Sequence, residues 1–126
     1  MSHAIIYNPE TCIIEITIQG DLFLNEVKEI TAEVARIAKD QNCFLVLNDV
    51  REATLKLSTA EIYELPKTMS EIFALSGLHA YQFSRALVAA KDLADIQFLE
   101  NVTANRGQNV KWFQDIDKAK QWLSEK

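Results

Sequence analysis

Short apolar runs alternate with longer amphipathic segments along the whole chain. Residues 3–7 and 12–19 are rich in β-branched side chains, and the Asn-Pro-Glu-Thr sequence at residues 8–11 has the composition of a turn. In the second run the even positions are apolar and most odd positions are polar, so we expect one face of this strand to be buried. The pattern predicts an N-terminal β-hairpin.

The first long amphipathic segment runs from Leu24 to Ala38, where apolar residues recur at helical spacing. Asn25 is the expected N-cap, and acidic residues in the first turn and basic residues in the last turn suit the helix dipole. The following residues 43–47, Cys-Phe-Leu-Val-Leu, are apolar on both faces. They predict a central strand that is covered on two sides.

A second helix is predicted to follow a loop at residues 48–57. Ser58 and Glu61 have the Ser-x-x-Glu spacing of a capping box, and the apolar stripe then continues to Phe73. Pro66 interrupts the stripe, which predicts a kink or two short helices. Gly77 suits the left-handed conformation that ends many helices.

The last third of the chain repeats the same alternation. We expect a strand at residues 85–90, a helix capped by Asp92, a short strand at residues 110–113 and a helix capped by Asp115. The order β-β-α-β-α-β-α-β-α predicts an α/β fold with a single, mostly parallel five-stranded sheet. We expect residues 1–126 to form one domain.

The composition of the chain excludes some classes of partner and location. The chain has 126 residues and a net charge of −5, and its basic residues are scattered, so we expect no nucleic-acid partner. The apolar runs are too short to span a bilayer, and the first residues lack the features of a signal peptide. We therefore expect no transmembrane segment and a cytoplasmic protein. Cys12 and Cys43, each in an apolar run, are expected to be buried, reduced thiols.

Polar residues that follow the third strand are the first candidates for a site, because ligands of parallel sheets gather at the carboxyl ends of strands. Asp49 could accept a phosphoryl group, bind a metal or act as a base, or it could cap a turn and pair with Arg51. Ser58 and Thr59 could be phosphorylated, or they could serve only to cap the helix.

Known catalytic patterns are missing. The two histidines are not near a nucleophile motif, and the three glycines are too dispersed for a nucleotide-binding loop. We therefore expect no enzyme activity, no catalytic residue, no cofactor and no metal.

A second candidate site is the segment of residues 62–83, which carries more apolar side chains than one helix face can bury. The surplus could line a cavity for an apolar ligand or form a homodimer surface, or it could simply be core. The candidate residues are Ile62, Leu65, Met69, Ile72, Phe73, Leu78 and Tyr81.

The chain resembles the STAS superfamily, in particular its stand-alone bacterial members related to anti-sigma-factor antagonists and to CRAL-TRIO-like lipid-binding domains. The resemblance rests on the element order, the strand end Val-Leu-Asn-Asp at residues 46–49, the Ser-Thr helix start and the Val-Lys-Trp-Phe pattern near the C-terminus. It implies that Asp49 and Ser58 match the family's conserved strand-end aspartate and its phosphorylated serine. Leu57 stands where the family has a second aspartate.

These observations favour a non-enzymatic regulatory module that binds a protein partner, or a second copy of itself, through residues 49–61 and the helix that follows. The alternative is a carrier or sensor of an apolar small molecule or lipid. An enzyme of unknown class is a distant third reading.

Overall fold

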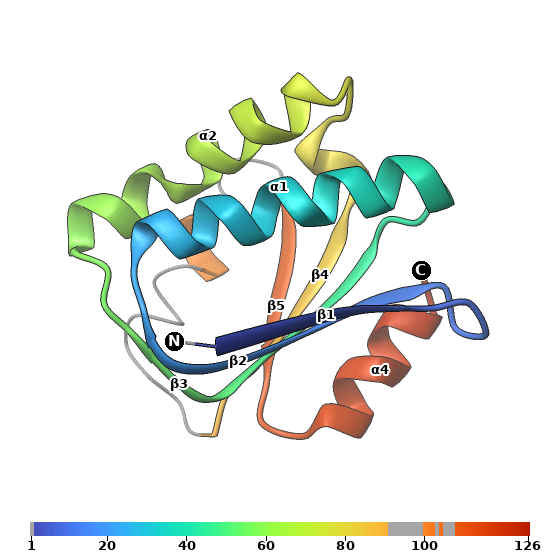
Figure 1. Cartoon of the computed structure of the whole chain (residues 1–126). Coiled ribbons are helices and arrows are strands. Elements are labelled where there is room, and N and C mark those ends of the chain that lie inside the picture. The colour runs from blue at the N-terminus through green and yellow to red at the C-terminus, as the bar shows by residue number, and fades with distance from the viewer. Residues whose placement is uncertain (1, 91–99, 103, 105–107) are drawn as a thin grey trace.

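Five strands lie in the sheet in the same order as in the chain, β1 to β5 (Figure 1). The structure is a computed structural model, and it describes residues 2–90, 100–102, 104 and 108–126. The predicted helix at residues 92–102 therefore lies mostly outside the described residues. Within the described part, helices cover both faces of the sheet, as the α/β pattern predicted.

The N-terminal hairpin is confirmed. Strand β1 (Ser2–Asn8) pairs antiparallel with β2 (Ile13–Leu22), with Ile5 opposite Ile16. Cys12 closes the turn with a φ of 57° and donates its backbone N–H to the Asn8 carbonyl at 2.9 Å. Because this turn projects from the sheet, Cys12 is exposed, and the prediction that it is buried was wrong. Cys43 is buried as predicted, and both thiols are free.

The remaining strands are parallel to β2, as predicted: β3 (Leu45–Leu55), β4 (Ser84–Val88) and β5 (Asn109–Phe113). Strand β3 is central, but it is longer than expected, and the prediction of a loop at residues 48–57 was wrong. The end of β2 pairs with it as far as Leu22 opposite Leu55. Backbone pairing needs no apolar side chains, so polar residues extend both strands where one face is open to solvent.

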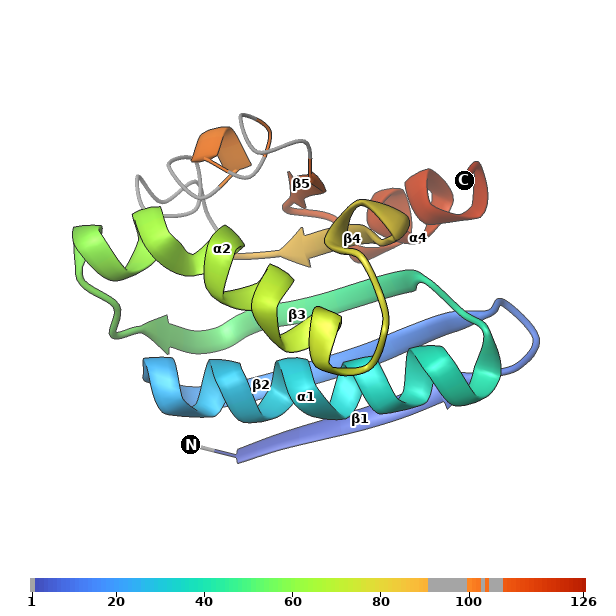
Figure 2. The same ribbon diagram turned by 90° about the horizontal axis from the view of Figure 1, so that it is seen from above.

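Helices α1 (Leu24–Gln41) and α2 (Thr59–Leu75) lie side by side on one face of the sheet, and α4 (Ile116–Ser124) lies on the other (Figures 1 and 2). The short 3-10 helix Ala80–Gln82 follows α2. Asp115 caps α4 as predicted, since its Oδ1 accepts the Asp117 N–H at 2.8 Å. The end of α2 is also confirmed, with Gly77 at a φ of 75°.

The predicted N-cap of α1 was wrong, because the N-cap is Phe23 and Asn25 lies inside the first turn. Of the two outcomes predicted at Pro66, a kink or two short helices, the second is wrong, because α2 runs through Pro66 as one helix. Pro66 is a buried residue of this helix, and its carbonyl accepts a hydrogen bond from Gln108 Nε2 at 2.9 Å. Packing of this kind offsets the hydrogen bond that a proline inside a helix removes.

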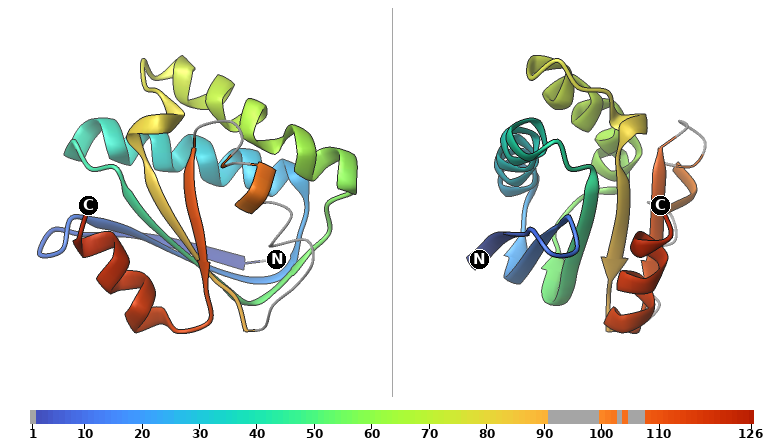
Figure 3. Two further views of the ribbon diagram at one scale, coloured as in Figure 1. Left: turned by 180° about the vertical axis from the view of Figure 1, so that it is seen from behind. Right: turned by 90° about the vertical axis from the view of Figure 1, so that its right-hand side faces the viewer.

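The two faces of the sheet carry separate cores. Figure 3 shows the helices that cover them, with α1 and α2 on one face and α4 on the other. Alternation along each strand sends Val46 and Arg85 toward α1 and α2, while their neighbours Leu47 and Ala86 pack toward α4. The α4 core is small and includes Ala119 and Leu123, both fully buried. The larger core, under α1 and α2, contains the candidate cavity.

Candidate functional site

Asp49 and Arg51 form a closed ion pair on β3. Arg51 donates from Nε to Asp49 Oδ1 at 2.9 Å and from Nη2 to Oδ2 at 2.7 Å, which is the bidentate geometry typical of arginine and carboxylate. These hydrogen bonds lower the pKa of the Asp49 carboxyl, although partial burial opposes them. The pair is therefore ionised at neutral pH, and Arg51 occupies both carboxylate oxygens.

Ser58 forms the predicted capping box at the start of α2. Its Oγ accepts the Glu61 N–H at 3.1 Å, and Glu61 Oε1 accepts the Ser58 N–H at 2.8 Å. Thr59 is the first residue of the helix, and both Ser58 and Thr59 are exposed. A phosphate on Ser58 would stand beside the Glu61 carboxylate, so it would have to open this box.

The structure does not join these two pairs into one site. Asp49 follows Leu47 on the strand face that packs toward α4 and holds Arg51 in its ion pair, whereas Ser58 begins a helix on the opposite face. Arg51 bonds to Asp49 and Ser58 bonds to Glu61, with no hydrogen bond between the pairs. Their roles as a partner-binding or phosphoacceptor site stay predictions.

The apolar segment at residues 62–83 divides between core, cavity and surface. Ile62 and Leu78 are buried in the core, and Ile72 is half-buried. Tyr81 is 70% exposed and stacks on His79, with their ring centroids 5.1 Å apart. The candidate residues that line the cavity are Leu65, Met69 and Phe73.

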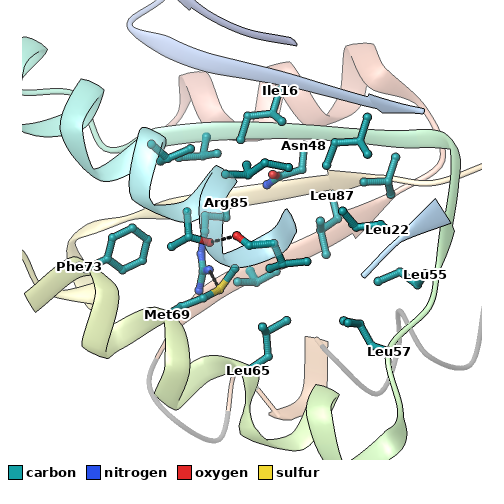
Figure 4. Close-up of a pocket in the computed structure, with 18 residues that line it drawn as sticks. Ile16, Leu22, Asn48, Leu55, Leu57, Leu65, Met69, Phe73, Arg85 and Leu87 are labelled. Atoms are coloured by element: carbon teal, nitrogen blue, oxygen red, sulfur yellow. Dashed lines mark hydrogen bonds between the residues drawn. The ribbon is translucent and has the colours of Figure 1, made fainter. Parts of the chain in front are cut away.

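The cavity has a volume of about 100 Å³ and lies between α1, α2 and the sheet (Figure 4). Most of its wall is apolar. Helix α1 contributes Val27, Ile30 and Val34, and the rest comes from α2, from strands β2 to β5 and from Leu57 between β3 and α2. Its polar side chains are Thr31, Asn48 and Arg85. Thr31 donates to the Val27 carbonyl of its own helix at 2.7 Å, and Asn48 Nδ2 donates to the Ala86 carbonyl at 3.4 Å.

Arg85 is a buried cation in this wall. It is 5% exposed, and desolvation lowers the pKa of its guanidinium to about 10, so it still carries a charge at neutral pH. Its Nη1 donates to the Met69 sulfur at 2.7 Å, and its Nη2 donates to Gln108 Oε1. Its Nε has no hydrogen-bond partner. In the described part of the chain, no carboxylate is paired with it.

Gln108 holds the guanidinium in place. Its two amide protons are directed to α2, where Nε2 donates to the Pro66 carbonyl at 2.9 Å and to Ser70 Oγ at 3.1 Å. The amide oxygen is therefore left to face Arg85. Gln108 is only 6% exposed, and its hydrogen bonds link Arg85 of β4 to helix α2.

Sequence reasoning missed Arg85 and Gln108 as parts of a site. One signal was present, because Arg85 is the charged residue of the short strand Ser-Arg-Ala-Leu-Val, which the α/β pattern places between two covered faces. The Gln108 bonds had no local signal, because they depend on packing between segments far apart in the chain.

Other kinds of site find no support in the described ranges. Among residues 2–90, 100–102, 104 and 108–126, no three His, Cys, Asp or Glu side chains gather as a metal site would require. Within the same ranges no helix has the length and apolar character to cross a membrane.

The hairpin, the parallel strands and the helix placement define a STAS-like α/β fold. A solved structure of the anti-sigma factor antagonist SpoIIAA in its unphosphorylated form matches it with a TM-score of 0.59 and 9% sequence identity. The match covers 97% of this chain and 97% of that one. No protein-family model and no curated protein matches the sequence. The likeness therefore establishes the fold that the sequence pattern predicted.

Proposed function

We propose that this chain is a non-enzymatic regulatory module that binds a protein partner through residues 49–61 and the rest of helix α2. The observation that carries this proposal is the match, over 97% of both chains, to an anti-sigma factor antagonist. Ser58, at the expected place for a regulatory serine, has an exposed hydroxyl at a helix N-terminus, where backbone N–H groups and the helix dipole favour an added phosphate.

Exposed aromatic side chains near this end support a protein partner. Phe23 is 49% exposed and Tyr63 is 52% exposed. The residue before Phe23 is tied to the chain that leads into α2. Leu22 pairs with Leu55, and the Leu22 carbonyl accepts the Lys56 N–H at 2.8 Å. Phe23 therefore lies near the start of α2. Large aromatic residues of this kind dominate the binding energy of many protein interfaces. A partner surface here would combine Phe23, Tyr63 and the Ser58 hydroxyl.

The test is quantitative affinity purification from cells with the wild type and two variants at Ser58. Ser58→Asn keeps a good N-cap without charge, whereas Ser58→Asp keeps the cap and adds a negative charge. We expect a partner that is retained by the wild type and by Ser58→Asn, and is lost with Ser58→Asp. Equal retention by both variants would contradict a switch at Ser58.

A further variant tests the proposed surface of Phe23 and Tyr63 separately from the proposed switch at Ser58. The double change Phe23→Ser and Tyr63→Ser should remove the same partner while the far-UV circular dichroism spectrum stays unchanged, since both side chains are about half exposed. Retention of the partner by this folded variant would contradict the proposed surface.

A second function is favoured by the cavity, namely binding of an apolar small molecule between α2 and the sheet. Small-molecule sites are mostly apolar with a few polar groups that orient the ligand, and this cavity has that composition. Native mass spectrometry of gently purified protein tests the idea and also reports whether the chain is a homodimer. A ligand-free mass, together with no binding of added apolar probes, would contradict it.

A further inference from the structure

Arg85 places one positive charge in the wall of the cavity, and the described part of the chain offers no negative charge to balance it. None of the described lining residues is acidic. The partners of the guanidinium are the sulfur of Met69, which is a weak acceptor, and the neutral amide oxygen of Gln108. Buried charges in proteins are normally paired, so this arrangement suits a site that takes its anion from a ligand.

The donors of Arg85 are not all used. A guanidinium carries five N–H groups in one plane, and here the Nε group has no partner. Figure 4 shows Arg85 beside Met69 on one side of the cavity, with Leu22, Leu55 and Leu57 toward the other. Gln108 fixes the plane of the guanidinium through its bonds to α2. The cavity thus has one cationic region and one apolar region.

The charge and the size of the cavity restrict the ligand. One cation balances one negative charge, and the planar fork of arginine matches a carboxylate. A volume of about 100 Å³ is smaller than the cavity of roughly 150 Å³ that accommodates benzene in an engineered protein core. A long acyl chain does not fit such a volume, whereas a short one does.

We propose that the cavity binds a compact, apolar monocarboxylic acid, with Arg85 holding its carboxylate and the leucine-rich end holding its hydrocarbon part. This inference rests on the second proposed function, that the cavity holds an apolar ligand. It adds the chemical class of the ligand and the residue that selects it.

The experiment compares propanoate, propan-1-ol and dodecanoate by isothermal titration calorimetry with the full chain at neutral pH. A charge-assisted hydrogen bond that the alcohol lacks should make propanoate bind roughly 10- to 100-fold more tightly than propan-1-ol. Arg85→Met keeps the length of the side chain and removes its charge, so it should reduce this preference to about parity. Arg85→Gln serves the same purpose if the methionine variant does not fold.

Val46→Phe is the control for location, because Val46 lines the cavity from β3 and a larger side chain there fills it. This variant should lose binding of both three-carbon probes. Equal binding of propanoate and propan-1-ol to the wild type would overturn the role of Arg85 while leaving the cavity function intact. Tighter binding of dodecanoate would overturn the size limit, and binding of no probe would overturn the cavity function itself.

Discussion

The two faces of the sheet are built from the same strands but differ in the side chains that they bury. Toward α4 the buried cluster is entirely apolar, and Ala86, Val88, Ala119 and Leu123 are all 0% exposed. Toward α1 and α2, the same strands present Asn48 and Arg85 among large apolar residues and leave a cavity of about 100 Å³. No described residue of α4 lines that cavity.

This contrast separates stability from binding within one sheet. Close packing contributes dispersion energy at every contact, whereas a cavity loses those contacts and a buried cation adds a desolvation cost of the order of several kcal/mol. The α4 face therefore behaves as a structural core. The α1 and α2 face carries features that lower stability, and these are the features that the proposed ligand would use.

The largest expected effect is a truncation on the closely packed face. Leu123→Ala should lower the free energy of unfolding by about 2–5 kcal/mol, because Leu123 is 0% exposed and its loss leaves a void under α4. Urea denaturation followed by circular dichroism measures this change. Lys120→Ala, at an exposed position of the same helix, is the control and should stay within about 0.5 kcal/mol. A small loss at Leu123 would break the contrast.

A larger side chain should change the free energy of unfolding in opposite directions on the two faces. Ala119→Leu should destabilise the protein by about 1–3 kcal/mol, because it overpacks a closed core. Val34→Ile adds one methylene group to the cavity wall and should raise the free energy of unfolding by about 0.5 kcal/mol. The same urea titrations compare the two variants. Destabilisation by Val34→Ile as large as that by Ala119→Leu would show that the cavity has no usable space.

Removal of a helix N-cap should lower the free energy of unfolding by a similar amount on both faces, because a cap acts only on the first turn of its own helix. Ser58→Ala and Asp115→Ala each remove a side chain that accepts a backbone N–H, and each should cost about 1 kcal/mol. Thermal and urea unfolding of both variants check the prediction. Ser58→Asn should recover most of the loss. A much larger cost at one cap would mean that the faces differ in more than their packing.

The smallest effect should come from the surface pair on β3. The pKa of Asp49 is lowered in the folded protein, so its contribution to stability is present above the ordinary pKa of an aspartate and is lost as the pH falls below it. Arg51 is 40% exposed, so solvent screens the pair and keeps its contribution small. Unfolding free energies at pH 7 and pH 3 should differ less for Asp49→Asn than for the wild type. The same pH dependence in Asp49→Asn and in the wild type would show that the Asp49–Arg51 pair does not contribute to stability.

Much of the fold could be predicted because it depends on local patterns. Alternation at residues 12–19 predicted the half-buried β2, the two-sided apolar run at residues 43–47 predicted the central strand, and the Ser58 and Asp115 caps lie where their motifs place them. The failures also have physical causes. Polar residues of β3 looked like a loop, because backbone pairing with β2 leaves no trace in side-chain polarity. Pro66 looked like a helix break, because the packing that tolerates it is not local.

The amino-acid sequence by itself determined the α/β class, the element order and the two candidate regions. These depend on the spacing of apolar residues, on helix caps and on turns, which are all properties of residues close together in the chain. Only the tertiary structure decided that Asp49 and Arg51 lie on a different face from Ser58, and that Arg85, Met69 and Gln108 meet in one buried network. These outcomes depend on which face each strand residue takes and on contacts between segments 16 and 23 residues apart. A cavity is the space that such contacts leave, so no single segment encodes it.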